Sequence, residues 1–152
     1  MAAEETADAP EETVRANGPG LHLLLLEDDA TVAAVISGLL EAQGHRVDHV
    51  PNGLRALQAL ADQGYDAALV DLDLPGVDGF QWARMVRLRQ QGAHLPMIAI
   101  TARSGGNEET LAREAGMDGF LRKPLHGAQL AKALAAAMRA SRPGASRHST
   151  NG

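Results

Sequence analysis

The chain has 152 residues and a formal net charge of −5, which suits one domain with tails. Aromatic residues are few (one Trp, one Tyr and two Phe) and no basic stripe is visible, so nucleic-acid binding is not expected. The lack of cysteine excludes disulfides, thiolate zinc sites and a cysteine nucleophile, and it suits a cytoplasmic location. Because no apolar run approaches the length of a spanning helix, direct membrane contact is not expected.

The first predicted element follows an acidic lead over residues 1–20 that we expect to be disordered. The apolar run from Leu21 to Leu26 predicts a strand, which ends in the acidic run Glu27-Asp28-Asp29. A helix should follow, because apolar residues recur at helical spacing. Its predicted core face consists of Val32, Val35, Ile36, Leu39 and Leu40. A strand of imperfect alternation comes next, from His45 to Val50.

The middle of the chain predicts a helix, a buried strand and a second helix. Asn52 should cap the first helix, which ends near Gly64. The run from Ala67 to Val70 has no helical period and predicts a buried strand that delivers Asp71 to a turn at Pro75-Gly76. The second helix should end at Gly92, with Phe80, Ala83, Val86 and Met85 toward the core and Arg84, Arg87 and Arg89 on the other side.

The last third predicts two more strand–helix pairs. Leu95 to Ile100 reads as a central strand that exits at Thr101, and Glu108 to Ala115 as a short helix. A short strand lies between Met117 and Leu121, and a helix ends at Ala140, before a disordered tail over 141–152. Strand–helix alternation repeated five times predicts one α/β domain over 21–140, with a parallel sheet and helices on both faces. For this sheet we expect the doubly wound order 2-1-3-4-5 of flavodoxin-like folds, which the alternation alone does not set.

Chemically distinctive residues follow four of the predicted strands. In that strand order the exits bring together Glu27, Asp28, Asp71, Thr101 and Lys123. Crowded carboxylates repel one another unless a cation joins them, and hard oxygen ligands select Mg²⁺. With Lys123 and Thr101 available to contact further oxygens, this set suits transfer of a phosphoryl group onto Asp71.

Each of these residues also has an ordinary structural interpretation. The acidic run could serve only as the start of a helix, where the helix dipole stabilises negative charge. Thr101 and Asp71 could cap turns, and Lys123 could be a solvated surface charge. Only the combination of all of them at equivalent strand ends favours a reactive site.

Four motifs in order carry a family resemblance: LLLLEDD, LVDLDLPGVDGF, IAITA and GMDGFLRKP. From about Leu21 to Ala140 the chain resembles a response-regulator receiver domain. The resemblance implies that Asp71 is the phosphoryl acceptor and that Thr101 and Lys123 complete the catalytic set. It further implies an Mg²⁺ site made by Glu27, Asp28, Asp71 and the backbone carbonyl of Asp73, with Asp28 as a direct ligand.

The same resemblance assigns a switch and a pair of tuning residues. Phe120 lies at the position of an aromatic side chain that turns inward when Thr101 is drawn to the phosphoryl group, and Pro124 follows a cis peptide bond. Asp73 and Arg103 occupy two positions that vary within the family and tune the loss of the phosphoryl group. We predict that they form an ion pair or water-bridged contact, whose removal changes dephosphorylation more than phosphorylation.

Two alternatives stay open. Asp71-Leu72-Asp73 also fits the first motif of haloacid-dehalogenase-type phosphatases, in which the first Asp attacks and the second is an acid or base. Against this, Leu74-Pro75 is an unusual continuation and no acid follows Lys123. The second alternative is a degenerate receiver that acts only as a binding module.

The resemblance also implies partners and a biological role. The chain would be primarily a signalling switch that catalyses its own phosphorylation and dephosphorylation. Its partners would be a sensor histidine kinase, a histidine phosphotransfer domain, or both. None of the six scattered histidines lies in a phospho-donor pattern. The run GMDGFLRKPL and the acidic lead favour the receiver of a hybrid kinase over a stand-alone regulator, and the oligomeric state is open between monomer and weak dimer.

Overall fold

A computed structural model describes residues 20–76, 78–89, 94–103 and 106–141. The predicted lead and tail, and the predicted helix end at Gly92, fall outside these ranges apart from Gly20 and Ser141. Among the described residues, every helix is too short or too polar to cross a membrane.

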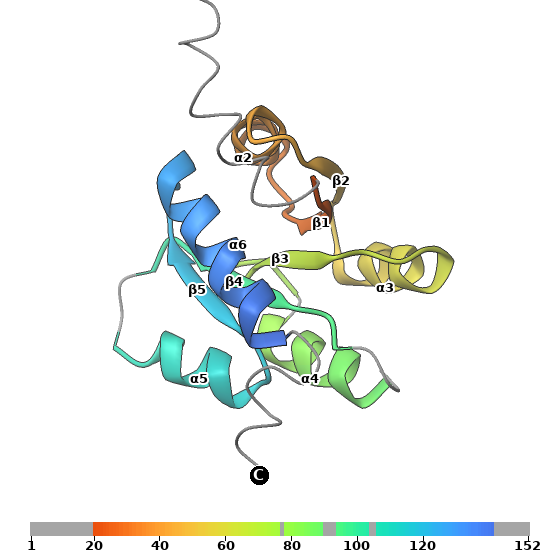
Figure 1. Ribbon diagram of the computed structural model, residues 1–152. Coiled ribbons are helices and arrows are strands. Elements are labelled where there is room, and N and C mark those ends of the chain that lie inside the picture. Colours follow the sequence, from red (N-terminus) through yellow and green to blue (C-terminus); the bar gives the residue numbers. More distant parts are fainter. Residues whose placement is uncertain (1–19, 77, 90–93, 104–105, 142–152) are drawn as a thin grey trace, which may run out of the picture.

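Five parallel strands form one sheet in the predicted order, β2-β1-β3-β4-β5 (Figure 1). The strands are β1 (His22–Leu26), β2 (Arg46–Val50), β3 (Ala67–Asp71), β4 (Met97–Thr101) and β5 (Gly119–Arg122). Every residue of β3 and β4 is buried, which explains why both read as continuous apolar runs without alternation.

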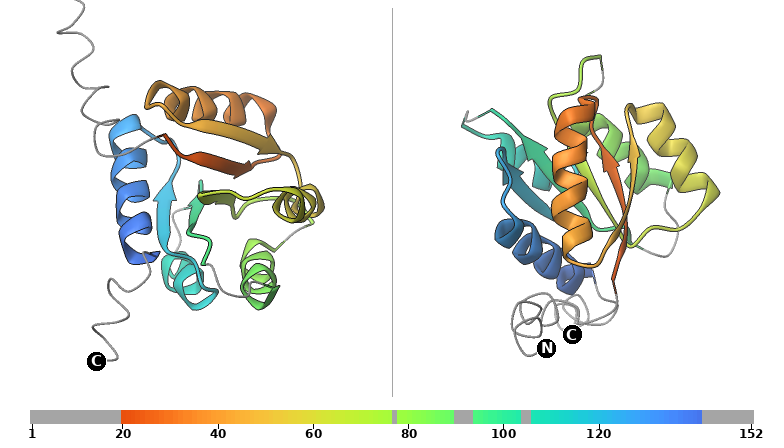
Figure 2. Two further views of the ribbon diagram at one scale, coloured as in Figure 1. Left: turned by 45° about the vertical axis from the view of Figure 1, so that its right-hand side comes forward. Right: turned by 90° about the horizontal axis from the view of Figure 1, so that it is seen from above.

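Helices cover both faces of the sheet (Figure 2), and the described residues form five of them. They are α2 (Ala30–Ala42), α3 (Gly53–Asp62), α4 (Gly79–Arg89), α5 (Glu108–Glu114) and α6 (Gly127–Ser141). Leu23 and Leu25 of β1 pack in the same cluster as α2 and α6, whereas Leu24 and Leu26 pack with α3, α4 and α5. Successive side chains of a strand point to opposite faces, so the sheet divides two apolar cores.

Side-chain caps set the starts of three helices. Asp29 Oδ1 accepts the amides of Thr31 at 2.9 Å and Val32 at 3.1 Å, which begins α2. Asn52 Oδ1 accepts from the Arg55 amide at 2.8 Å, so the predicted cap of α3 is confirmed. Asp78 Oδ1 accepts the Phe80 amide at 2.9 Å at the start of α4. Each cap satisfies backbone donors that the first turn leaves without partners.

The predicted core faces of two helices need correction. Val35 is 59% exposed and Met85 is 43% exposed, whereas Trp82 is buried and donates Nε1–H to the Gly53 carbonyl at 3.1 Å. A helix lying on a sheet buries a narrow stripe, and about 100° separates successive residues. In α2 that stripe passes through Ala33, Ile36 and Leu40, which turns Val35 toward its flank.

The prediction that Arg87 faces away from the core is wrong. Its side chain is only 19% exposed and bridges α4 to the loops before β4 and β5. The guanidinium donates to the Gly116 carbonyl at 2.7 and 2.9 Å, to the Leu95 carbonyl at 2.7 Å and to Asp118 at 2.9 Å. A buried Arg is stable where all its donors find acceptors, and these acceptors are distant in sequence.

Candidate functional site

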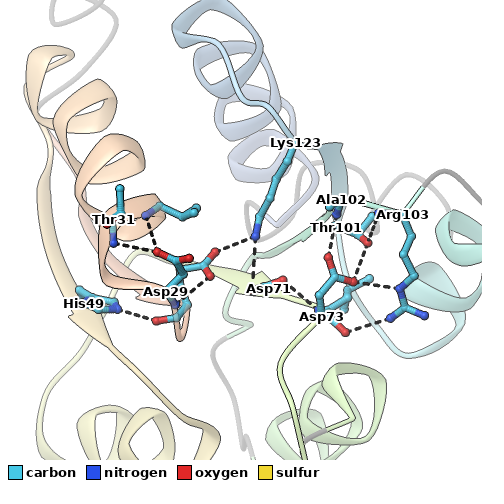
Figure 3. Close-up of polar contacts among 12 residues, drawn as sticks. Asp29, Thr31, His49, Asp71, Asp73, Thr101, Ala102, Arg103 and Lys123 are labelled. Carbon is cyan, nitrogen blue, oxygen red and sulfur yellow. Dashed lines mark hydrogen bonds and ion pairs between the residues drawn. The ribbon is translucent and has the colours of Figure 1, made fainter.

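The carboxyl ends of four neighbouring strands carry the predicted site. Asp71 is the last residue of β3 and Thr101 the last residue of β4. Glu27 follows β1 and Lys123 follows β5 directly. Because β1, β3, β4 and β5 are consecutive in the sheet, these side chains meet at one edge, as the sequence predicts. Figure 3 shows Asp71, Thr101 and Lys123 at this edge.

Three of the carboxylates near that edge form a compact acidic group. Glu27, Asp28 and Asp71 each offer an oxygen atom, and these atoms lie within 4.8 Å of one another. Glu27 is 1% exposed and Asp71 2% exposed, whereas Asp28 is exposed to solvent. Asp29 is separate, because its carboxylate caps α2. The acidic run therefore contributes both a helix cap and a potential ligand set.

Lys123 lies between the two buried carboxylates. Its ammonium nitrogen is 3.0 Å from Glu27 Oε1 and 3.4 Å from Asp71 Oδ2. Burial opposes the charge on Lys123, but contacts with Glu27 and Asp71 outweigh burial and raise the pKa of the ammonium. Burial raises the pKa of Glu27, and the neighbouring Asp71 adds to that rise against the opposing effect of Lys123. The pKa values of Lys123 and Glu27 are therefore both raised, and the two side chains form a close pair at 3.0 Å.

Asp73 turns its carboxylate toward the end of β4. It accepts hydrogen bonds from the Thr101 hydroxyl at 2.9 Å, the Ala102 amide at 2.7 Å and Arg103 Nε at 2.9 Å. The predicted ion pair between Asp73 and Arg103 is thus confirmed. Burial alone would raise the pKa of Asp73, but these hydrogen bonds hold it below its usual value.

The backbone of the loop after β3 connects Asp73 to the acceptor strand. The Asp73 amide donates to Asp71 Oδ1 at 2.9 Å, which fixes the orientation of the Asp71 carboxylate. The turn continues at Gly76, whose φ of 71° lies in the left-handed region that glycine adopts without strain. Because the Asp73 carboxylate is bonded to Thr101, Ala102 and Arg103, it lies outside the acidic group. Only the backbone carbonyl of Asp73 is a candidate ligand.

The donor set fits Mg²⁺ on chemical grounds. All candidate ligands are hard oxygen atoms, and the solvent-exposed Asp28 leaves space for water molecules in the coordination shell. Glu27 Oε1 is buried and receives no hydrogen bond of good geometry within the described residues, although the Lys123 ammonium is near. A buried carboxylate oxygen in that situation can still accept a cation.

Phe120, the predicted switch residue, lies in β5, partly buried against the core of α3, α4 and α5. The guanidinium carbon of Arg122 lies 5.1 Å from its ring centroid, and Arg122 Nη1 donates to the Arg103 carbonyl. The Lys123–Pro124 peptide bond is cis, as the resemblance implies. The sequence analysis missed Arg122, because its partners lie in different segments.

His49 is a second residue that the sequence analysis missed. Its Nε2 lies 2.6 Å from the Glu27 carbonyl oxygen, so the end of β2 holds the backbone that carries the acidic pair. Nothing in the alternating pattern of β2 marks this histidine, because the contact depends on the pairing of β2 with β1.

A family model for the response regulator receiver domain matches residues 23–135. The chain belongs to this family. Sensor histidine kinase GacS of Pseudomonas protegens is 34% identical over 128 residues, which cover 82% of this chain and 14% of the relative. Transcriptional regulatory protein TcrA of Mycobacterium tuberculosis is 35% identical over 128 residues, covering 83% of this chain and 50% of the relative. This receiver chain thus spans half or less of the length of these curated relatives.

A solved receiver domain shows the same likeness in three dimensions. The receiver domain of sensor histidine kinase PA1611 from Pseudomonas aeruginosa is 36% identical, with a TM-score of 0.68. The match covers 76% of this chain and 94% of that domain. That structure has a magnesium ion coordinated in its active site cleft. The family, the fold and the role as a receiver of two-component signalling are therefore established for this chain.

Proposed function

We propose that Asp71 accepts a phosphoryl group from a phosphohistidine, with Mg²⁺ bound by Glu27, Asp28, Asp71 and the backbone carbonyl of Asp73. The observation that carries the proposal is the position of Asp71, which is 2% exposed at a strand end, beside Lys123 and within an oxygen-rich acidic group. A carboxylate held in this way is a positioned nucleophile. When bound, Mg²⁺ offsets the negative charge of the incoming phosphoryl group.

The residues divide the chemistry of the transfer. An Asp71 carboxylate oxygen forms a bond to phosphorus while the phosphorus–nitrogen bond of the phosphohistidine breaks, and the imidazole keeps the electron pair. The ammonium of Lys123 lies 3.4 Å from Asp71 Oδ2 and stabilises a phosphoryl oxygen by charge. The hydroxyl of Thr101 donates a hydrogen bond to a second phosphoryl oxygen. Its movement toward that oxygen releases Phe120 to turn inward.

The proposed partners follow from this chemistry. The phosphoryl donor is a histidine kinase or a histidine phosphotransfer domain, and the phosphorylated state changes contacts with other proteins rather than with nucleic acid. Relatives of the chain include a sensor histidine kinase and a transcriptional regulatory protein, so receivers of both settings resemble it. We place the receiver in the cytoplasm, where histidine kinases obtain the phosphoryl group that they transfer.

Phosphoryl transfer from a small donor tests the proposal directly. Wild-type protein with phosphoramidate and Mg²⁺ should gain the mass of one phosphoryl group, and Asp71→Asn should gain none. Asp62→Asn is the matched control, because Asp62 is an exposed carboxylate at the end of α3. Chelation of Mg²⁺ should prevent the gain in every variant.

The result also separates the two alternatives. Repeated release of phosphate from a phosphate monoester would favour a phosphatase of the haloacid-dehalogenase type. A binding module would be favoured if the folded wild-type protein gains no mass from phosphoramidate and Mg²⁺ and its amide resonances do not shift with beryllofluoride. Either outcome would contradict Asp71 as a stoichiometric acceptor.

A further inference from the structure

The end of β4 already binds an anion, and that anion belongs to the protein. Asp73 Oδ1 accepts from the Thr101 hydroxyl at 2.9 Å, while Asp73 Oδ2 accepts from the Ala102 amide at 2.7 Å (Figure 3). Two donors from consecutive residues thus converge on the two oxygens of one carboxylate. Donors arranged in this way form a site for any anion of similar size, including two oxygens of a phosphoryl group.

The Thr101 hydroxyl has a single proton, and its direction is settled by its neighbours. The Arg103 amide donates to Thr101 Oγ1 at 3.0 Å, so that contact uses a lone pair of the hydroxyl. The proton must then point to the other partner, Asp73, which as a carboxylate can only accept. While this bond persists, Thr101 has no proton to donate to a phosphoryl oxygen.

The occupied donors lie beside the acceptor. Asp71 ends β3 and Asp73 lies two residues later, and the amide of Asp73 donates to Asp71 Oδ1 at 2.9 Å. β3 pairs directly with β4, which ends at Thr101. Thr101 is fully buried, so its hydroxyl can donate only to a group that lies within the site. A phosphoryl group on Asp71 would therefore need donors that Asp73 already holds.

We propose that the Asp73 carboxylate is an internal competitor of the phosphoryl group, because it occupies the hydroxyl of Thr101 and the amide of Ala102 in the resting protein. The inference rests on the proposed role of Asp71 and deepens it. On phosphorylation the Asp73 side chain withdraws, and its two donors pass to phosphoryl oxygens. Asp73 is thus a positioning residue that sets how readily the site accepts a phosphoryl group, in addition to how long it keeps one.

Arg103 can stay with Asp73 after that withdrawal. Its side chain is 57% exposed, and its guanidinium also donates to the Leu72 carbonyl at 3.2 Å. A long side chain anchored at the mouth of the site can follow a displaced carboxylate without losing the ion pair. The competitor is then held near the site and returns once the phosphoryl group has left.

Titration with beryllofluoride in the presence of Mg²⁺ measures the competition. We expect Asp73→Ala to bind beryllofluoride about tenfold more tightly than wild type, because the wild type must first break two hydrogen bonds to a charged group. Asp73→Asn, which keeps the shape but loses the charge, should fall between them. The amide resonances of Thr101 and Ala102 report binding, and urea unfolding checks that each variant is folded.

A matched control removes a carboxylate that takes no part in the site. Glu109 pairs with Arg113 on the exposed surface of α5 at 2.9 Å, the same separation as Asp73 and Arg103. Glu109→Ala should bind beryllofluoride with wild-type affinity. An equal affinity of Asp73→Ala, Glu109→Ala and wild type would overturn the competitor while leaving Asp71 as the acceptor.

A double-mutant cycle distinguishes competition from a general effect of charge. If Asp73 acts by holding the Thr101 proton, its removal should improve binding much less in a Thr101→Val background. A purely electrostatic effect would give the same gain in both backgrounds, and that result would overturn the competition for the Thr101 proton. If no variant binds beryllofluoride although all are folded, the proposed role of Asp71 fails as well.

Discussion

Lys123 illustrates how one residue keeps two buried carboxylates tolerable. Its ammonium is 3.0 Å from Glu27 and 3.4 Å from Asp71, and both carboxylates are almost completely removed from solvent. Without the lysine, the two acids would face each other at low dielectric, which is costly unless one takes up a proton. Lys123 therefore supports the stability of the resting site as well as its chemistry.

We expect Lys123→Met to lower the free energy of unfolding by about 3 kcal/mol in the absence of Mg²⁺, because it leaves a buried charge without its partner. Lys132→Met is the matched control, since Lys132 is exposed on α6 and should change stability little. Urea unfolding followed by circular dichroism measures both. Equal stability of the two variants would show that the contacts of Lys123 contribute nothing net to folding.

His45 gives a prediction for pH. Its Nδ1 accepts the Leu21 amide at 3.0 Å, and burial lowers the pKa of His45 below its ordinary value of 6.5. The unfolded chain therefore takes up a proton near pH 6.5, whereas the folded chain does so only at lower pH. The stabilisation from neutral His45 is complete above that value and is lost as the pH falls below it.

We expect the stability advantage of wild type over His45→Asn to shrink between about pH 7.5 and pH 5.5, by up to about 1 kcal/mol. The measurement is urea unfolding of both proteins at each pH. His126→Asn serves as the control, because His126 is exposed and lies away from the Leu21 amide. An advantage that grows on acidification would reverse the sign that burial predicts.

Helix α4 is attached to the sheet through Arg87 as well as through its apolar face. The guanidinium spans the loops before β4 and β5, and its donors reach the Gly116 and Leu95 carbonyls and the Asp118 carboxylate. At Gly116 a side chain would also collide, because an added Cβ would lie 2.9 Å from Arg87 Cγ. The contact therefore constrains both the helix and the turn that leads into β5.

We expect Arg87→Met to reduce the free energy of unfolding by about 3 kcal/mol, since it removes the donors to the Gly116 and Leu95 carbonyls and the strongest cation beside Asp118. Asp118 keeps its contacts with His94 and the Met97 amide. Arg84→Met, on the exposed side of the same helix, should cost less than about 0.5 kcal/mol. The midpoint and slope of urea unfolding give the free energy of unfolding of each variant. If both variants lose a similar free energy of unfolding, Arg87 contributes no more than a solvent-facing residue, as the helical pattern predicted.

Across the whole molecule, the site and the face made by α5, β5 and α6 are connected through β5. Phe120 and Arg122 lie in this strand and Lys123 follows it, and Arg122 both contacts the Phe120 ring and donates to the Arg103 carbonyl. A change in the loop after Thr101 therefore reaches the switch residue through an arginine as well as through the strand. We propose that this connection couples the loop after Thr101 to Phe120 when Asp71 is phosphorylated.

We expect beryllofluoride with Mg²⁺ to shift amide resonances along β5 and α5, while those of α3 change little. Arg122→Ala should alter the balance between the two states of Phe120 by roughly two- to fivefold, the effect of losing a cation–π contact worth about 0.5 to 1 kcal/mol. Arg113→Ala, an exposed change on α5, is the control. If the shifts in Arg122→Ala match those in the control, Arg122 does not couple the loop to Phe120.

Much of this architecture could be predicted from local patterns. Strand–helix alternation and unbroken apolar runs predicted a parallel sheet, and the exits of those runs led to Glu27, Asp71, Thr101 and Lys123. The strand order came from the likeness to flavodoxin-like folds. Helical periodicity was less reliable for the orientation of the helices. In α2 the predicted core face includes Val35, which is exposed, and in α4 it omits Trp82, which is buried. The period of a helix is a local property, but its rotation against the sheet depends on how distant side chains fill the core.

The sequence by itself determined that this protein has a parallel sheet whose strand ends gather acids, a hydroxyl and a lysine, since short-range residue patterns set strands and their exits. Only the tertiary structure decided which acid does what. Asp29 caps α2, Asp28 joins the buried carboxylates, and Asp73 takes the hydrogen bond of Thr101. Hydrogen bonds reach only about 3 Å, so segments far apart in sequence must meet before a donor selects its acceptor.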